Sequence, residues 1–273
     1  MISRNIDKRH QFFLAVLLAT ALVAIALLGP SLAPHDPLET DFLHILEPPS
    51  ALYPLGTDQV GRCILSRLLY GARISLGMTF GMLSMIFVLG ILIGIAAGMR
   101  GGAVDTCIMR VADTILAFPD LVFAIAVVGL LGPGIVNTIC ALAIIWWTKF
   151  ARLSRVLVRT AMQSDAVIAG RMAGASRFTL IRHYVLPAIL PPMLTQLSLD
   201  IGNMMLALAG LSFLGLGVQP PTPEWGNMLS EGKEYLQSAP WLVIYPGLAT
   251  FAVVVVFNIL GDATRKYLNP ERI

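Results

Sequence analysis

Charged side chains are scarce in this sequence. Of its 273 residues, 13% are Asp, Glu, Lys or Arg, whereas 56% are hydrophobic, and the mean hydropathy is +0.77. A soluble globular domain has about 25% charged residues, and its interior could not bury this much apolar surface. The shortage of charge therefore excludes an ordinary soluble domain and indicates helices that are covered by lipid.

Motifs for enzyme chemistry are also missing. The three cysteines form no CxxC pair and the four histidines are isolated, which favours single thiols over a disulfide or metal role. The phosphate-binding GxxxxGK[ST] is absent, as are HExxH and GxSxG. We therefore expect a protein that is not an enzyme and binds no cofactor, so that any ATP hydrolysis has to occur on another subunit.

Long apolar runs divide the chain into six candidate membrane helices, each near the roughly 20 residues that a bilayer requires. They predict an all-α, polytopic membrane protein with spans at 12–33, 74–99, 113–131, 135–150, 186–218 and 241–261. The first run is longer than the core of a signal peptide, about 7–15 residues, and Pro34 follows its cleavage-like ending. We expect this first helix to be retained.

Lysine and arginine are distributed unevenly between the two sides of these spans. With the N-terminus inside, 15 of the 19 fall in inner segments, and the outer segments hold Arg62, Arg67, Arg73 and Lys233. Because short loops rich in Lys and Arg stay in the cytoplasm, we expect both termini there and the protein in the inner membrane. The net charge of +3 gives no indication of a nucleic-acid partner.

No linker, repeat or second domain is visible in the sequence. We expect residues 1–273 to form a single transmembrane domain. Its parts are a cytoplasmic tail at 1–11, the first helix at 12–33, an outer segment at 34–72 and a five-helix core at 74–262. That core contains the longest inner loop, at 152–185.

Glycines recur at four-residue spacing in the second span. They are Gly77, Gly81, Gly90, Gly94 and Gly98. A small-residue face of this kind lets helix backbones approach closely in lipid. We expect it to pack against another helix of this chain or against a partner subunit.

The inner loop combines basic and small residues. Three arginines open it at helical spacing: Arg152, Arg155 and Arg159. Small residues follow at 166–175, where Gly174 suits a turn with positive φ, and Leu186 and Pro187 would restart a membrane helix with proline in its first turn. A narrow helix of this kind can enter a groove on another protein, although an ordinary positive loop without a partner would have the same composition.

Five segments, in the same order, resemble the peptide/nickel branch of ABC importer permeases. They are Leu55–Arg62 with Ser66-Arg67, Gly71–Gly77, Ala117–Pro119, the loop Ser164–Pro187, and the long motif Leu211–Leu229. The chain is therefore identified as a member of this family. It departs from the family pattern at Ile168, where the loop signature has glutamate, and at Cys63, where related chains usually carry aspartate.

The resemblance implies a type I permease fold within a heteromeric complex that works by alternating access. The partners would be a second homologous permease, two ATPase subunits that bind ATP and magnesium, an extracytoplasmic substrate-binding protein and membrane lipid. The ATPases would contact the inner loop. Ala169 and Gly174 match the family's loop signature. The candidate coupling residues are Ala169, Gly170, Arg171, Ala173, Gly174, Leu186 and Pro187.

Asp200 is a carboxylate deep in the fifth span, where an ionised group costs about 2.5–3.5 kcal/mol on insertion scales. Such a group faces either a watery path or a partner, here the second permease. Asn203 and Met204 follow by one helical turn and are expected on the same side. Carboxylate, amide and thioether groups are acceptable ligands for a transition metal or a cationic chelate, so Asp200 is our candidate metal contact.

The order Asp200-Ile-Gly followed by Met-Met resembles the nickel permeases of the branch, which tend to have histidine at the place of Asn203. Oligopeptide and dipeptide permeases lack this aspartate and carry an acidic residue near the place of Leu208. We therefore expect import of nickel or a metal–chelate complex. Import of dipeptides or oligopeptides is the alternative, and other small solutes come third.

Asp120 is the second acidic residue expected within a span. It follows Pro119, which opens or kinks the third helix. Its carboxylate would cap backbone donors that the proline frees, or it would line the inner end of the transport path.

Overall fold

The computed structural model describes the backbone of residues 2–268 and the side chains of residues 9–267. Within that part the chain is helical, with irregular connections. The helices are α1 (Ile2–Leu32), α2 (Ile64–Arg100), α3 (Gly102–Leu116), α4 (Asp120–Leu131), α5 (Ile135–Met162), α6 (Asp165–Met172), α7 (Arg177–Leu180), the π-helical η1 (Ile181–Val185), α8 (Leu186–Phe213), α9 (Trp225–Gly232), the 3-10 helix η2 (Lys233–Tyr235) and α10 (Trp241–Leu268).

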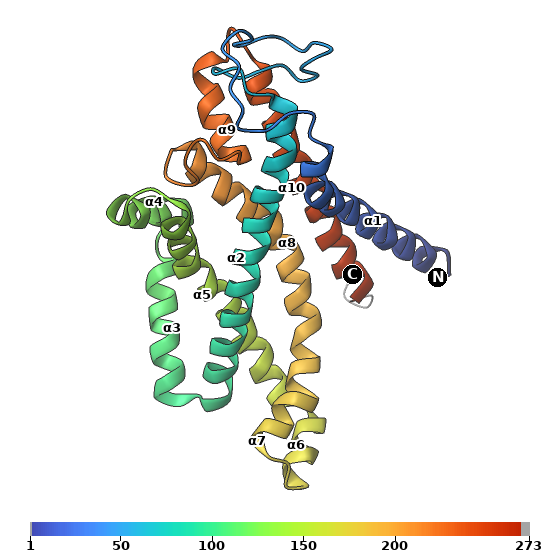
Figure 1. The fold of residues 1–273 in the computed structure, drawn as a ribbon. Coiled ribbons are helices and arrows are strands. Elements are labelled where there is room, and N and C mark those ends of the chain that lie inside the picture. The colour runs from blue at the N-terminus through green and yellow to red at the C-terminus, as the bar shows by residue number, and fades with distance from the viewer. Residues whose placement is uncertain (1, 269–273) are drawn as a thin grey trace.

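Four long helices, α2, α5, α8 and α10, form the centre of the molecule (Figure 1). Helix α1 packs on one side, against α10 and α2, while α3 and α4 lie on the other side, against α5. The short helix α9 and the irregular segment after α1 form one extremity, the α9 end. Helices α6 and α7 protrude at the opposite extremity, the α6 end.

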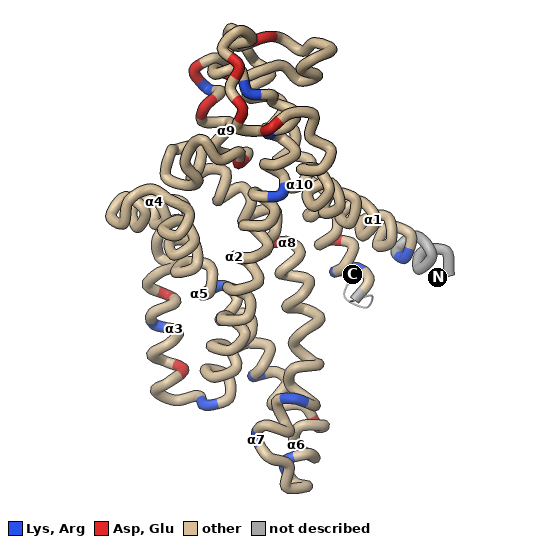
Figure 2. Tube along the Cα trace, in the orientation of Figure 1, with Lys and Arg blue, Asp and Glu red and all other residues tan. Residues whose placement is uncertain are grey.

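Five helical segments of the described chain are long and apolar enough to cross a membrane, and a bent pair makes a sixth if it counts as one span. The prediction of an all-α, polytopic protein with about six membrane helices is therefore confirmed. Charges gather outside the apolar centre, and Figure 2 shows a cluster of Asp and Glu at the α9 end.

The expected third span, residues 113–131, is wrong as a single helix. Helix α3 begins eleven residues earlier, at Gly102, and the axes of α3 and α4 differ by 91°. Pro119 causes the break, because proline disfavours the helical conformation of the residue before it and cannot donate a backbone hydrogen bond. Its own ψ of 129° is extended, and α4 starts at the next residue.

The glycine face of α2 packs against α5 at three of its five positions. A Cβ at Gly90 would overlap Phe150, one at Gly94 would overlap the backbone of Ala151, and one at Gly98 would lie 2.8 Å from Val158. The prediction of close helix packing is thus confirmed within this chain for Gly90, Gly94 and Gly98. Around Gly77 and Gly81 nothing described lies within 4 Å, so these two glycines remain open on the surface.

Candidate functional site

The α6 end carries a short helix that ends in a defined turn. The N–H of Gly174 donates to the carbonyl of Arg171 at 3.1 Å, and the N–H of Ala175 donates to the carbonyl of Gly170 at 3.0 Å. These two bonds form a Schellman motif, which needs a left-handed residue at the turn. Gly174 has a φ of +82°, so the expected positive φ at this glycine is confirmed.

The small residues of this loop divide into two faces. Val167 and Gly170 are buried, and a Cβ on Gly170 would lie 3.1 Å from Leu180 and 3.3 Å from Tyr184. The opposite face is open to solvent and consists of Ala166, Ile168, Ala169, Arg171, Met172, Ala173 and Gly174. Gly170 therefore holds α6 against its own chain, whereas Ala169, Arg171, Ala173 and Gly174 are free to meet another protein.

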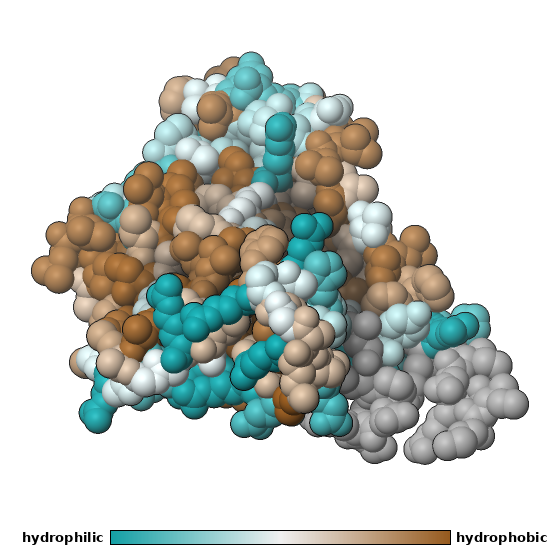
Figure 3. Space-filling view, turned by 90° about the horizontal axis from the view of Figure 1, so that it is seen from below, coloured by the Kyte–Doolittle hydropathy of each residue, from teal (hydrophilic) through white to brown (hydrophobic). Residues whose placement is uncertain are grey.

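Apolar side chains protrude at this end. Met172 is 85% exposed and Phe178 is 69% exposed. Figure 3 looks at the α6 end and shows hydrophilic side chains gathered on it, with lighter, less polar side chains among them. An exposed apolar projection with a basic rim is typical of a contact with another protein.

Helix α8 begins at Leu186 with Pro187 in its first turn, as expected, although no break precedes it. Helix α7, the π-turn η1 and α8 follow one another directly, and the N–H of Leu186 donates to the carbonyl of Ile181. The π-turn absorbs the hydrogen bond that Pro187 cannot make. Helices α7, η1 and α8 thus form one continuous helical rod from residue 177 to residue 213.

The arginines of the inner loop lie in α5, which continues to Met162, and they pair with acidic residues of α3. Arg155 Nη2 and Arg159 Nη2 donate to Asp105 Oδ2 at 2.7 and 2.5 Å, and Arg152 pairs with Asp113. These contacts attach α3 to α5. These pairs were not expected from the sequence, because the acidic partners lie some forty to fifty residues earlier in the chain.

Asp200 lies near the middle of α8 and is 6% exposed. Its two carboxylate oxygens accept hydrogen bonds from side-chain amides of the same helix. Gln196 Nε2 donates at 2.9 Å and Asn203 Nδ2 at 3.4 Å. Gln196 was not expected as a partner from the sequence. It precedes Asp200 by four residues, and side chains at this spacing are neighbours on the surface of a helix.

Asn203 and Met204, which follow Asp200 by one helical turn, differ in their exposure. Asn203 is exposed, whereas Met204 is fully buried in the hydrophobic core. On an α-helix, residues three and four positions further on fall on either side of the starting residue. Here Asn203 turns outward, whereas Met204 turns toward the hydrophobic core.

Asp120, at the start of α4, pairs with Lys149 of α5, and both side chains are 38% exposed. The Lys149 ammonium also lies 4.3 Å from the ring centroid of Trp146. Sequence reasoning missed Lys149 as a site residue because it placed this lysine at a helix end. A lone lysine inside an apolar run was nevertheless the same kind of signal as Asp200.

No preformed metal cage is visible in the described part of the chain, since no three His, Cys, Asp or Glu side chains come together there. Asp200, Asp120 and Lys149 instead form a sparse set of charges around α4, α5 and α8.

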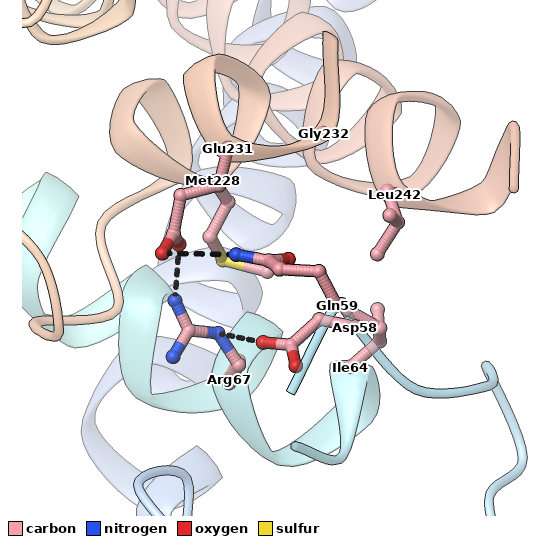
Figure 4. A pocket seen from close by; sticks show the side chains of 8 residues that line it. All are labelled: Asp58, Gln59, Ile64, Arg67, Met228, Glu231, Gly232 and Leu242. Atoms are coloured by element: carbon pink, nitrogen blue, oxygen red, sulfur yellow. Dashed lines mark hydrogen bonds and ion pairs between the residues drawn. The ribbon is translucent and has the colours of Figure 1, made fainter. Parts of the chain in front are cut away.

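A buried charge network at the α9 end connects the motif Leu55–Arg62 with Ser66-Arg67 to Glu231 of α9 (Figure 4). Arg67 Nη2 donates to Glu231 Oε2 at 2.6 Å. Arg62 donates to Glu231 Oε1 at 3.0 Å and to Asp58 Oδ2 at 2.5 Å. Gln59 Nε2 completes the set, 3.4 Å from Glu231. The network ties the segment before α2 to α9.

The chain is similar to known transport proteins. A family model described as "Binding-protein-dependent transport system inner membrane component" matches residues 90–273. The nickel transport system permease protein NikC of Escherichia coli K12 is 40% identical over 268 residues, which cover 98% of this chain and 97% of that protein. The di/tripeptide transport system permease protein DppC of Pseudomonas aeruginosa UCBPP-PA14 is 42% identical over 256 residues, or 92% of this chain and 84% of that protein.

A solved structure supports the fold. A chain of the MetNI methionine ABC transporter, in an inward-facing conformation, aligns with a TM-score of 0.60 at 17% sequence identity. The alignment covers 74% of this chain and 95% of that chain. Together with the relatives and the family model, these likenesses lead to one conclusion: the chain belongs to the family of inner-membrane components of binding-protein-dependent transport systems, that is, the ABC importer permeases.

Proposed function

We propose that this permease subunit moves nickel, free or as a metal–chelate complex, across the cytoplasmic membrane by alternating access. A second homologous permease, two ATPase subunits that bind ATP and magnesium, and an extracytoplasmic binding protein would complete the complex. The α6 end and both termini would face the cytoplasm. The segments on that side of the expected membrane helices hold 15 of the 19 Lys and Arg residues, and short loops rich in these residues stay in the cytoplasm. The observation that carries the proposal is the position of Asp200.

The surroundings of Asp200 support a hydrated path along α4, α5 and α8. The Asp120–Lys149 pair connects the start of α4 to the apolar helix α5, and both side chains are 38% exposed, where contact with lipid tails would be costly. This side of the molecule is therefore expected to face water or the second permease. Two carboxylates against one ammonium leave a net negative charge, which favours passage of a cation.

Nickel uptake tests this proposal. Cells that express the whole transport system would take up radiolabelled nickel, with and without a chelator. Asp200→Asn should reduce uptake by about tenfold or more, whereas Asp262→Asn, which changes an exposed carboxylate in the last turns of α10, should leave it unchanged. Equal uptake by the two variants would remove Asp200 from the path.

Dipeptide import is the second candidate. Lys149 supports it, since an ammonium in the path could hold a peptide carboxylate while Asp200 holds the amino group, and the DppC relative is similarly close in sequence. Absence of nickel uptake, together with growth on dipeptides that depends on this gene, would favour the peptide over the metal.

The exposed face of α6 supports a role in coupling to the ATPases. Ala169, Ala173 and Gly174 keep the profile of this helix narrow, while Met172 and Phe178 offer apolar contacts. The ATPase dimer would press on this face as it closes, and the continuous rod from α7 to α8 would pass the movement to Asp200. Leu186 and Pro187 would serve as part of that rod.

Gly174→Asp tests the coupling role. It should abolish transport while the protein still inserts into the membrane, because the substitution strains the turn and adds a charge to the contact face. Gly215→Asp is a matched control, since Gly215 also has positive φ (+77°) and open space around it. Normal transport by Gly174→Asp would refute coupling through this face.

A further inference from the structure

The segment after α1 forms a loop, residues 36–49, whose tip is apolar. Four large side chains stand out from it: Leu38 is 48% exposed, Phe42 69%, Leu43 91% and Ile45 45%. We name these four residues the apolar tip. The tip belongs to the α9 end, where the loop reaches beyond the ends of α2 and α10 (Figure 1). Lipid tails cannot cover it there if those helices span the membrane.

Hydrogen bonds give this loop a defined shape. The N–H of Leu38 donates to Asp36 Oδ1 at 2.8 Å, and the N–H of Leu43 donates to Asp41 Oδ1 at 3.0 Å. Both are Asx turns, in which an aspartate replaces a backbone acceptor. Asp41 also accepts a bond from Tyr53 at 3.1 Å. The turn at Asp41 thus holds Phe42 and Leu43 in the solvent, although the hydrophobic effect by itself would favour a loop that buries these two side chains.

The loop is anchored to the charge network of the α9 end. The N–H of Asp41 donates to the carbonyl of Val60 at 3.2 Å, and the N–H of Leu46 donates to the carbonyl of Asp58 at 3.1 Å. The side chain of Asp58 belongs to the network that also contains Arg67, in α2, and Glu231, in α9. A displacement of the apolar tip would therefore be transmitted to α2 and α9, because hydrogen bonds and ion pairs connect the loop to both helices.

Acidic side chains surround the apolar tip. Asp36 and Glu39 are exposed and Glu47 is half-buried, whereas the arginines nearest in sequence, Arg62 and Arg67, are buried in ion pairs. A membrane surface with phosphate headgroups would be repelled by this rim. A soluble protein with an apolar depression and a basic border fits it, because opposite charges steer the encounter and apolar contacts supply affinity.

We propose that the apolar tip is the docking contact for the extracytoplasmic binding protein of this transport system. The inference rests on the proposed function, which places the α9 end outside the cell and assigns this partner. The family description names transport that depends on a binding protein, and the tip is an apolar, outward-held surface at that end. Docking would displace the loop, and the Asp58–Arg67–Glu231 network would transmit this displacement to α2 and α9.

Binding to the assembled transporter tests the proposal. The complex of both permeases and both ATPases would be placed in nanodiscs of neutral lipid, and the affinity of the labelled, purified binding protein measured by fluorescence anisotropy. The double variant Phe42→Ser/Leu43→Ser should weaken binding by about tenfold or more, because central apolar anchors dominate such interfaces. ATP hydrolysis without the binding protein should not change.

A control and a second variant keep the test specific. Leu236→Ser changes a comparably exposed side chain elsewhere at the α9 end, 54% exposed, and should bind like the unaltered complex. Glu39→Lys should slow association and reduce its dependence on salt, because it acts through the charged rim. Correct assembly of each variant would be checked by size-exclusion chromatography.

Three outcomes would overturn the proposal. Unchanged affinity in the double variant would remove the tip from the interface and leave the proposed function intact. Loss of the second permease from the complex would make the tip a subunit contact instead. Failure of the unaltered complex to bind any binding protein would refute both claims: that the transporter uses such a partner, and that the apolar tip is its docking contact.

Discussion

Arg67 offers a direct test of what the buried network contributes to stability. Its side chain is 1% exposed, and its guanidinium lies 2.6 Å from Glu231 and 3.6 Å from Asp58, with the carbonyls of Pro221 and Pro37 at 3.3 and 3.5 Å. Arg67→Met removes the cation but keeps much of the volume. The two carboxylates would then share a single arginine, Arg62.

The expected cost follows from that arrangement. Breaking a buried ion pair from one side costs about 3–5 kcal/mol, because it leaves a buried charge without compensation. Arg62 still reaches both carboxylates, at 2.5 and 3.0 Å, so we expect a loss near the lower limit, about 3 kcal/mol. Replacing both partners, Arg67→Met with Glu231→Leu, should cost much less than Arg67→Met alone.

The assay is denaturant unfolding of the detergent-solubilised chain, followed by tryptophan fluorescence, since Trp225 donates to the carbonyl of Leu68 one residue from Arg67. Arg73→Met is the matched control, because Arg73 is exposed on the same helix and its loss should cost less than about 0.5 kcal/mol. Two results would refute the reasoning. One is an equal loss of unfolding free energy for Arg67→Met and Arg73→Met. The other is a double variant, Arg67→Met with Glu231→Leu, that is less stable than Arg67→Met alone.

Three further predictions concern the packing, the loop and the attachment of α3. Gly94→Leu should destabilise the solubilised chain by about 1–3 kcal/mol or more, since its Cβ meets the backbone of α5, whereas Gly77→Leu should be nearly neutral in the same unfolding assay. The hydrogen bond from His44 holds the pKa of the Asp41 carboxyl below its usual value of about 3.9, so the ionised group stabilises the loop fully above about pH 4 and less as the pH falls through the lowered value. Pepsin should accordingly cut loop 36–49 faster at about pH 3 than at about pH 4, while Asp41→Asn should abolish that difference. Asp105→Ala should release α3 from its two arginines at a cost of roughly 1.5–3 kcal/mol, seen as faster hydrogen exchange along α3; unchanged exchange would show that apolar contacts hold it instead.

Several features followed from the sequence because they depend on local or additive physics. Apolar length determined the membrane helices, and the requirement for positive φ determined the role of Gly174 in a turn. The breaker at Pro119 was also visible in the sequence. The 91° angle that it produces was not, because that angle depends on how α4 packs against α5.

The candidate site was only half visible in the sequence. Asp200 stood out because an intramembrane carboxylate is costly anywhere in an apolar helix. Its amide partners were within one helical turn, and periodicity placed them near it. Whether Met204 turned toward the path or the core depended on the neighbouring helices, and the structure places it in the core.

The sequence by itself determined that this protein is helical, spans the membrane and carries a narrow helix at one end, because composition and periodicity are properties of each segment alone. Only the tertiary structure decided which distant residues meet. Asp120 and Lys149 are 29 positions apart, and Arg67 and Glu231 are 164 apart. Such pairs depend on how helices cross, and a crossing is set by the shapes of both packed faces together.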